Sequence, residues 1–291
     1  MRTRRCAALA TALLVALPLL AGCGGGSEAS GSGLRVVTSF YPLQYVVQRI
    51  AGERAEVANL TQAGKEPHDI ELSVRQTAEL GDADLVVYEK DFQAAVDDAV
   101  EQSDPDHVVE AGAAAGLEGD DPHFWLDPTR LAKVATSVEA QLADVDPAHA
   151  DEFAANLKAL DADLTSLDRS LSRGLSDCRV DTIVVSHDAF GYLGKRYGLD
   201  VVGINGLSPD AEPSPAHIRE LQGLIRDDGI TTVFSEELVS RKLADSLAGD
   251  LGIRTAVLDP IEGLSDATAG EDYLSLMRAN LRALQKGNRC T

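Results

Sequence analysis

Eight short runs rich in β-branched residues form two groups of four, and a long leucine-rich segment separates the two groups. The first group covers residues 34–39, 56–60, 84–88 and 107–109, and the second covers residues 181–186, 200–204, 231–235 and 254–258. Continuous apolar runs without alternation are typical of strands that are buried on both faces. Helical patterns lie between the runs, for example at 41–51, 74–80 and 216–225. This alternation indicates an α/β fold with parallel sheets.

The segment between the two groups predicts one long helix. Asp146-Pro147 is a helix start, with Asp as the N-cap and Pro at the first helical position. Apolar residues from Phe153 to Leu175 then recur every three or four positions, and no Gly or Pro interrupts them before Gly174. We expect a helix over residues 147–176, about 45 Å long at 1.5 Å per residue.

This helix divides the rest of the chain into two expected lobes, each with a four-stranded parallel sheet. Residues 34–146 form the N-terminal lobe and residues 177–291 the C-terminal lobe. A coiled-coil dimer is an alternative explanation of the leucine stripe. Because four strands lie on each side of the stripe, we prefer a rigid link between two lobes of a monomer.

Residues 1–33 have the features of an export signal followed by a tether. Arginines precede an apolar run at 7–20, which is shorter than the about 20 residues of a membrane span. The run ends in Leu20-Ala21-Gly22-Cys23, which resembles a bacterial lipobox and implies cleavage after residue 22 and diacylglycerol on Cys23. An ordinary signal peptide with an incidental cysteine is the alternative. Residues 23–33 are rich in Gly and Ser, as in a flexible tether. We therefore expect a lipid-anchored domain on the outer or periplasmic side of a membrane.

The charge of the chain argues against two kinds of partner. The formal net charge is −21, and loss of residues 1–22 removes three arginines and no acidic residue, which brings it to −24. A surface this acidic argues against binding to nucleic acid and against adhesion to anionic lipid.

The four cysteines have three expected fates. Cys6 is lost with the signal peptide, and Cys23 accepts the lipid. Cys178 and Cys290 remain, and a pair of cysteines in an exported protein predicts a disulfide. Their spacing excludes a CxxC type of redox or zinc motif.

Polar side chains gather after the predicted strands. His187, Glu236 and Asp259 directly follow the runs 181–186, 231–235 and 254–258, and His68 and His123 lie in the loops after 56–60 and 107–109. In proteins with open parallel sheets, bound molecules and ions lie at the carboxyl ends of the strands. Imidazole and carboxylate groups are the ligands of borderline divalent metals. We therefore expect a metal site at this edge, although loop capping or ion pairing would also explain the two carboxylates.

Four motifs resemble one known family. They are EPHDIELS (66–73), DPHFWLDP (121–128), SHDAFGYLGKRYGL (186–199) and GLSPDAEPSP (206–215). The chain resembles the zinc/manganese class of ABC-transporter solute-binding proteins over about residues 34–290. The resemblance implies two lobes linked by a rigid helix, a metal bound between the lobes, and an ABC-transporter permease as the partner.

The resemblance also implies the ligands. It places His68, His123 and His187 on the metal, and manganese members tend to have Glu at the position of His187. Because imidazole suits zinc better than manganese, Zn²⁺ is the expected bound ion and Mn²⁺ is the less favoured one. Asp259 matches the fourth position, with Glu236 or water as alternatives.

The function expected from these residues is capture of Zn²⁺ outside the cytoplasm for an ABC importer, without catalysis. A closed shell of four ligands suits binding because no position stays open for a reacting water. The alternatives are a Mn²⁺ transport protein or adhesin of the same fold, and a zinc hydrolase with Glu236 as the general base. The chain contains no HExxH motif to support a hydrolase.

Overall fold

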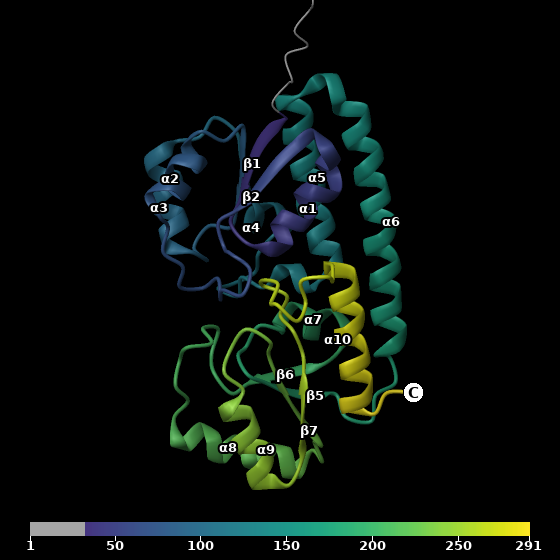
Figure 1. The fold of residues 1–291 in the computed structure, drawn as a ribbon. Helices are drawn as coiled ribbons and strands as arrows, with labels where there is room; N and C mark the ends of the chain where they lie inside the picture. Colours follow the sequence, from purple (N-terminus) through teal and green to yellow (C-terminus); the bar gives the residue numbers. More distant parts are fainter. Residues whose placement is uncertain (1–32) are drawn as a thin grey trace, which may run out of the picture. The chain divides into compact units, whose positions relative to one another are not determined.

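All eight predicted strands are present, and they form two parallel sheets (Figure 1). The first sheet has the order β2-β1-β3-β4 and consists of β1 (Leu34–Thr38), β2 (Ala55–Asn59), β3 (Leu85–Tyr88) and β4 (Val108–Glu110). The second has the order β6-β5-β7-β8 and consists of β5 (Thr182–Val185), β6 (Asp200–Gly203), β7 (Thr232–Ser235) and β8 (Arg254–Val257). Every pairing is parallel, which confirms the predicted α/β architecture.

The computed structural model describes residues 33–291, and Gly33–Thr291 form one compact unit. The predicted signal peptide, the lipidation site Cys23 and the tether up to residue 32 lie outside the described residues. Within the described part, no helix is both long and apolar enough to cross a membrane.

In both sheets, strand order places a crevice at the equivalent point of the carboxyl edge. The first strand of each sheet is central, because β1 lies between β2 and β3, and β5 lies between β6 and β7. The loop that leaves the central strand and the loop that leaves β3 or β7 therefore run to opposite sides of the sheet. This divergence opens a crevice at the carboxyl edge. His187 follows β5 and Glu236 follows β7, so both lie at this point of the second sheet.

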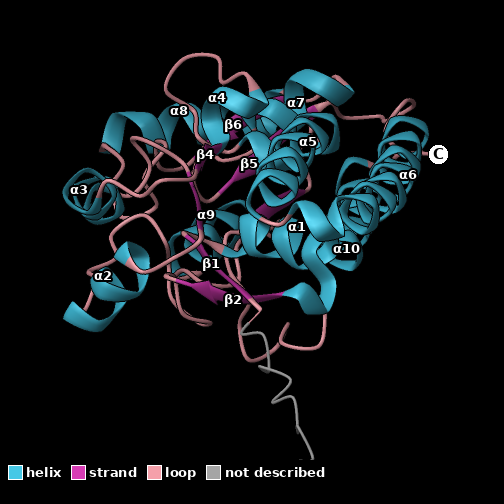
Figure 2. Cartoon of the chain, turned by 90° about the horizontal axis from the view of Figure 1, so that it is seen from above, coloured by secondary structure: helices cyan, strands magenta, loops and turns pink. Residues whose placement is uncertain are grey.

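Helices cover both faces of the first sheet. Figure 2 shows α2 and α3 on one side of β1, and α1, α5 and α6 on the other. The helices of this half are α1 (Tyr41–Ala51), α2 (Val74–Gly81), α3 (Ala94–Ser103), α4 (Ala111–Ala115), α5 (Pro128–Val145) and α6 (Ala150–Gly174), with 3₁₀ turns η1 (Gly52–Arg54), η2 (Phe124–Leu126) and η3 (Pro147–His149). The second half contains α7 (Gly191–Tyr197), α8 (Pro215–Asp227), α9 (Lys242–Leu251) and α10 (Tyr273–Asn288).

The long helix of the prediction is α6, with shorter bounds than expected. It begins at Ala150 because the preceding residues form the 3₁₀ turn η3, and it spans 25 residues, or about 37 Å. Helix α6 packs against α1 and α5 in the first half and against α10 in the second (Figure 1). Leu160, Leu164 and Leu167 of its stripe are at most 1% exposed. The leucine stripe is thus covered within the chain itself.

One hydrophobic cluster joins the two halves. It runs from Leu43 of α1 through Leu164 of α6 to Ile183 of β5 and Met277 of α10, and all four side chains are buried. Each sheet also has a smaller hydrophobic cluster on the face away from this shared core. One lies around β5, β7 and α9, and the other lies around β3 and α3. The two sheets therefore share their largest core, and α6 lies within it.

The predicted disulfide is present between Cys178 and Cys290. These residues also form an isolated antiparallel bridge, so the end of α10 is held beside the chain that enters β5. The disulfide confirms the pairing expected from the cysteine count.

Removal of this disulfide is expected to destabilise the fold without changing the metal site. The bond closes a loop of 112 residues, and loop-closure entropy gives a loss of up to about 4.7 kcal/mol in the free energy of unfolding. A Cys178→Ser/Cys290→Ser protein should show this loss in urea denaturation and should retain its Zn²⁺ affinity. An unchanged unfolding midpoint would contradict the prediction.

Candidate metal centre

Three histidines and one glutamate meet between the two sheets. His68, His123, His187 and Glu262 each offer one ligand atom, and these four atoms lie within 4.8 Å of one another. Among residues 33–291, this is the one group of three or more His, Cys, Asp or Glu side chains that comes so close together. The structure thus brings together the three histidines expected as ligands.

The spacing of the four atoms fits a small tetrahedral ion. Oε1 of Glu262 lies 3.4 Å from Nε2 of His68, 3.1 Å from Nε2 of His123 and 3.3 Å from Nε2 of His187. The Nε2 atoms of His123 and His187 are 3.3 Å apart. A tetrahedron with metal–ligand distances of about 2.0–2.1 Å has edges of about 3.3–3.4 Å. These four separations therefore match the edges of a four-coordinate zinc shell, and all four atoms lie within 4.8 Å of one another.

Each half of the molecule supplies two of the four groups. His68 lies in the loop between β2 and α2, and His123 directly precedes η2. His187 follows β5, and Glu262 follows β8. The side chains of His123 and His187 are fully buried and that of Glu262 is 2% exposed, whereas His68 is 11% exposed. His68 is thus the most exposed member of the cluster.

An acidic residue two positions earlier orients His123. Oδ1 of Asp121 accepts hydrogen bonds from the backbone N–H of His123, at 3.0 Å, and from its ring Nδ1–H, at 2.8 Å. The carboxylate can only accept, so the proton is on Nδ1 and Nε2 is free to bind a metal. Glu66 makes the same backbone contact with the N–H of His68.

Glu236 orients His187 in the same manner. Its Oε1 accepts hydrogen bonds from the backbone N–H of His187, at 3.1 Å, and from Nδ1–H, at 2.7 Å. Glu236 had been considered from the sequence as an alternative metal ligand, and the structure gives it this supporting contact. It is 2% exposed, so the bond forms away from water.

Replacing Glu236 by Gln is expected to weaken Zn²⁺ binding by about 10–100-fold, the usual cost of losing a ligand's hydrogen-bond partner. Glutamine keeps the shape of the side chain but removes the charge that favours Nδ1–H. The dissociation constant is measured by competition with a chromophoric chelator. Glu237→Gln is the control on the adjacent, partly exposed acid, and an equal loss in that protein would contradict the role of Glu236.

The facing imidazoles of His123 and His187 favour a positive charge between them. When both Nδ1 atoms carry protons, the Nε2 lone pairs of His123 and His187 face each other at 3.3 Å, which is repulsive unless a proton or a cation lies between them. Burial disfavours the imidazolium form of His187, but hydrogen bonds to Glu236 and Glu262 outweigh burial and raise its pKa to about 10. Burial likewise opposes the charge of Glu262, yet hydrogen bonds with the histidines hold its pKa well below the usual range. The site thus favours either protons or a metal cation.

The structure does not bring the predicted fourth ligand, Asp259, into the cluster. Leu258 alone separates Asp259 from the end of β8. Oδ1 of Asp259 accepts a hydrogen bond from the backbone N–H of Ile261 at 2.8 Å. Burial raises the pKa of Asp259 to about 7. The position predicted for Asp259 is occupied by Glu262, because the chain turns between these two residues.

A strained turn places Glu262. Ile261 has φ 59°, a left-handed conformation that is an outlier for a β-branched residue, and its side chain is fully buried. Such a conformation costs on the order of 1–3 kcal/mol and persists only where the surroundings enforce it. Nε1–H of Trp125 donates to the carbonyl of Pro260 at 2.7 Å, across the two halves of the molecule. Glu262 cannot be recognised from the sequence because no residue type in this segment indicates the left-handed backbone conformation.

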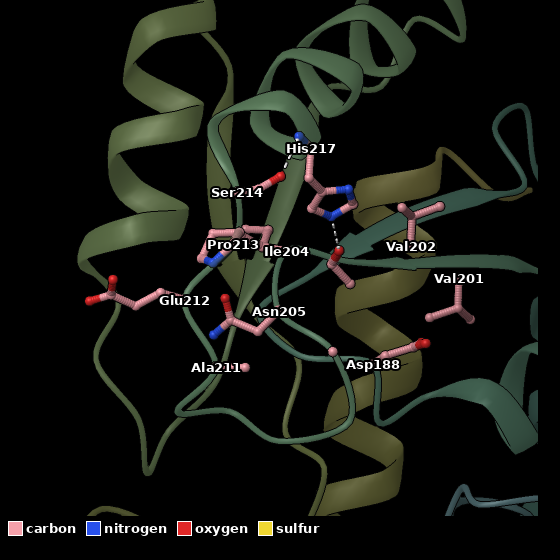
Figure 3. Close-up of a pocket in the computed structure, with 12 residues that line it drawn as sticks. Asp188, Val201, Val202, Ile204, Asn205, Ala211, Glu212, Pro213, Ser214 and His217 are labelled. Carbon is pink, nitrogen blue, oxygen red and sulfur yellow. Dashed lines mark hydrogen bonds between the residues drawn. The ribbon is translucent and has the colours of Figure 1, made fainter.

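A separate cavity of about 350 Å³ lies beside β6 and the loop after it (Figure 3). His217 and Asp188 line it, but neither belongs to the metal cluster. Nε2–H of His217 donates to the carbonyl of Gly203 at 2.9 Å, so this histidine holds the start of α8 against β6. Asp188 directly follows His187 in the sequence, but Nδ1–H of His187 is bonded to Glu236 and not to Asp188.

Comparison with known proteins decides the family. The profile of the family described as "Zinc-uptake complex component A periplasmic" matches residues 36–287. The chain belongs to this zinc-uptake component A family. The family is one of solute-binding proteins for zinc uptake and not of enzymes, so the hydrolase considered from the sequence does not apply.

Curated relatives are similar over most of the chain. The zinc-binding lipoprotein AdcA of Streptococcus pneumoniae is 36% identical over 96% of this chain and 60% of its own length. The chain thus spans about 60% of the length of this relative. The high-affinity zinc uptake system protein ZnuA of Bacillus subtilis is 33% identical over 92% of this chain and 93% of its own.

Two solved structures of similar chains have the same fold. The Zn(II)-bound ZnuA-like domain of S. pneumoniae AdcA matches with a TM-score of 0.77 and 36% identity over 88% of this chain and 99% of that one. The laminin-binding protein Lmb of Streptococcus agalactiae, described as having adhesin and metal transporting activity, matches with a TM-score of 0.81 and 33% identity over 88% and 99% of the chains.

Proposed function

We propose that this protein captures Zn²⁺ outside the cytoplasm and delivers it to the membrane permease of an ABC importer. The observation that carries the proposal is the cluster of His68, His123, His187 and Glu262, in which four of the six distances between ligand atoms match the edges of a tetrahedral zinc shell. Family membership supports the transport role, because the matching profile is that of a zinc-uptake component.

The donor set favours zinc over manganese. Three imidazoles and one carboxylate are borderline ligands, whereas Mn²⁺ prefers more oxygen donors and a larger coordination number. Four groups already surround the point at which the ion would bind, and they leave no open position for a reacting water. The arrangement therefore supports binding and release of a cargo ion.

The attachment of the protein follows from its N-terminal sequence and its relatives. The Leu20-Ala21-Gly22-Cys23 segment supports cleavage before Cys23 and anchoring through a lipid, and one relative is named a lipoprotein. The Gly- and Ser-rich residues 24–33 act as the tether. We infer a monomer, because the leucine stripe of α6 is covered by α1, α5 and α10 of the same chain.

The proposal is tested by Zn²⁺ titration of the protein without residues 1–22. We expect binding of one Zn²⁺ per chain, tight enough to compete with a chromophoric chelator, and weaker binding of Mn²⁺. His123→Ala should weaken Zn²⁺ binding by more than about 100-fold, beyond the usual effect of losing a supporting contact.

His217→Ala is the matched control. His217 is also partly buried and hydrogen-bonded, but it lies outside the cluster. If the two variants bind Zn²⁺ equally well, the site is wrong. Transport is then checked in cells, where loss of the permease and loss of this protein should give the same requirement for added zinc.

A further inference from the structure

Glu262 reaches the histidines only because the chain turns sharply after β8, and a residue on α10 holds that turn. Asn280 is 2% exposed and faces the backbone of Asp259. Its Oδ1 accepts a hydrogen bond from the N–H of Asp259 at 2.9 Å, and its Nδ2–H donates to the carbonyl of Asp259 at 2.6 Å. One amide side chain thus satisfies both backbone groups of the residue that begins the turn.

The other contacts of the turn complete a frame around Ile261. The carboxylate of Asp259 accepts from the N–H of Ile261 at 2.8 Å, and the carbonyl of Pro260 accepts from Nε1–H of Trp125 at 2.7 Å. Ile261 is held at φ 59° between these contacts and is fully buried. A left-handed isoleucine reverts to an extended conformation when its surroundings no longer enforce it.

We propose that Asn280 is a positioning residue for Zn²⁺ binding, which clamps the backbone of Asp259 and thereby aims the carboxylate of Glu262 at the three histidines. The proposal rests on the zinc-binding function proposed above and adds to it a residue with no atom on the metal. The amide is suited to this position because only Asn or Gln offers a donor and an acceptor side by side, and both are used here.

The same helix provides a matched control. Asn288 is also 2% exposed, and its Nδ2–H donates to the carbonyl of Val180 at 2.8 Å. Asn288 therefore ties α10 to the amino end of the second sheet, whereas Asn280 ties it to the carboxyl edge where the metal site lies. Loss of either residue weakens the attachment of α10, but only loss of Asn280 frees the turn before Glu262.

The decisive experiment is a double-mutant cycle on Zn²⁺ affinity. We expect Asn280→Ala to weaken binding by about 10–100-fold, the usual range for a supporting contact, and Asn288→Ala to change it by less than about threefold. In a Glu262→Ala background, Asn280→Ala should have no further effect, because the group that it positions is gone. An equal loss in both backgrounds, or no loss in either, would overturn the proposal.

Two further readouts separate positioning from a general loss of structure. Asn280→Asp keeps the acceptor for the N–H of Asp259 but removes the donor, so it tests the clamp if the alanine variant does not fold. With Co²⁺ as the probe, the visible absorption bands of this variant should match those of Glu262→Ala. Bands identical to those of the parent protein would show that Glu262 still binds the metal and would refute the proposal.

The metal-free protein gives an independent answer. Trp125 is the only tryptophan of the chain, and its indole N–H is bonded to Pro260 within the turn. Its fluorescence should change in Asn280→Asp and stay unchanged in Asn288→Asp. If the parent protein itself does not bind Zn²⁺, the proposed function fails, while unchanged emission in Asn280→Asp would refute the clamp alone.

Discussion

A Glu262→Gln protein is expected to bind Zn²⁺ at least about 100-fold more weakly than the parent protein. Glutamine retains the volume of the side chain but removes the only negative charge among the four groups that face the ion. Glu262 is 2% exposed, so water has little access to the site and cannot compensate for the lost negative charge. The dissociation constant is measured by chelator competition, and thermal unfolding of the metal-free variant verifies that it is folded.

Asp259→Asn is the matched comparison for this prediction. Asparagine can still accept the hydrogen bond from the N–H of Ile261, so the turn is preserved and Zn²⁺ affinity should change by less than about threefold. If the loss in Asp259→Asn equals or exceeds the loss in Glu262→Gln, Asp259 is the fourth ligand and the assignment from the structure is wrong.

Zn²⁺ affinity is expected to fall by about 100-fold between pH 8 and pH 6. The metal binds deprotonated Nε2 atoms, whereas hydrogen bonds to two glutamates raise the pKa of His187 to about 10 against the opposing effect of burial. Zn²⁺ must therefore displace at least this proton at neutral pH. One displaced proton lowers the apparent affinity about tenfold for each unit that the pH falls. The pKa of His123 is raised by its carboxylate partners despite burial, which adds to the slope.

Calorimetry in buffers of different ionisation enthalpy counts the released protons and checks this prediction. We expect at least one proton per Zn²⁺ at pH 7, and fewer in Glu236→Gln, because that change removes a group that holds the proton on His187. An affinity that is independent of pH between 6 and 8 would contradict the protonated metal-free site.

The same shifts indicate that acid releases the metal from a folded protein. A histidine with a raised pKa contributes stability that is complete below its unfolded pKa, about 6.5, and is lost as the pH rises through the folded value. Glu262 has a lowered pKa, so its contribution is present at neutral pH and is lost only when the pH falls well below the ordinary range of a glutamate. In mild acid both contributions remain while Zn²⁺ leaves.

The sequence predicts the strands and three members of the metal cluster because those follow from local rules. Apolar runs mark β5 and β7, and the rule that ligands lie at the carboxyl ends of parallel strands selects His187. The same rule selects Asp259, which the structure leaves outside the cluster, because the rule assumes that the first acidic residue after a strand faces the crevice. The left-handed conformation of Ile261 carries the chain past that point to Glu262.

The carboxylates that contact the histidine rings do not come directly after the histidines in the sequence. Asp69 and Asp188 follow their histidines, but Asp121 precedes His123 and makes the contact. In both EPH and DPH the acidic side chain accepts from the N–H of the histidine two residues later, which is a common local pattern for Asp and is made here by Glu66 as well. This Asp/Glu-Pro-His pattern is visible in the sequence and points to Asp121. The contact of Glu236 with His187 depends on the pairing of β5 with β7 and has no local sequence signal.

The hydrophobic cluster that joins the two sheets through α6 also determines how the protein comes apart. Leu164 and Leu167 of α6 lie in the same cluster as Leu43 of the first half and Ile183 of the second. Neither half can lose its structure without exposing apolar side chains that the other half covers. We therefore expect the two sheets to unfold as one cooperative unit, and damage to either half to lower the amount of the whole protein that stays folded.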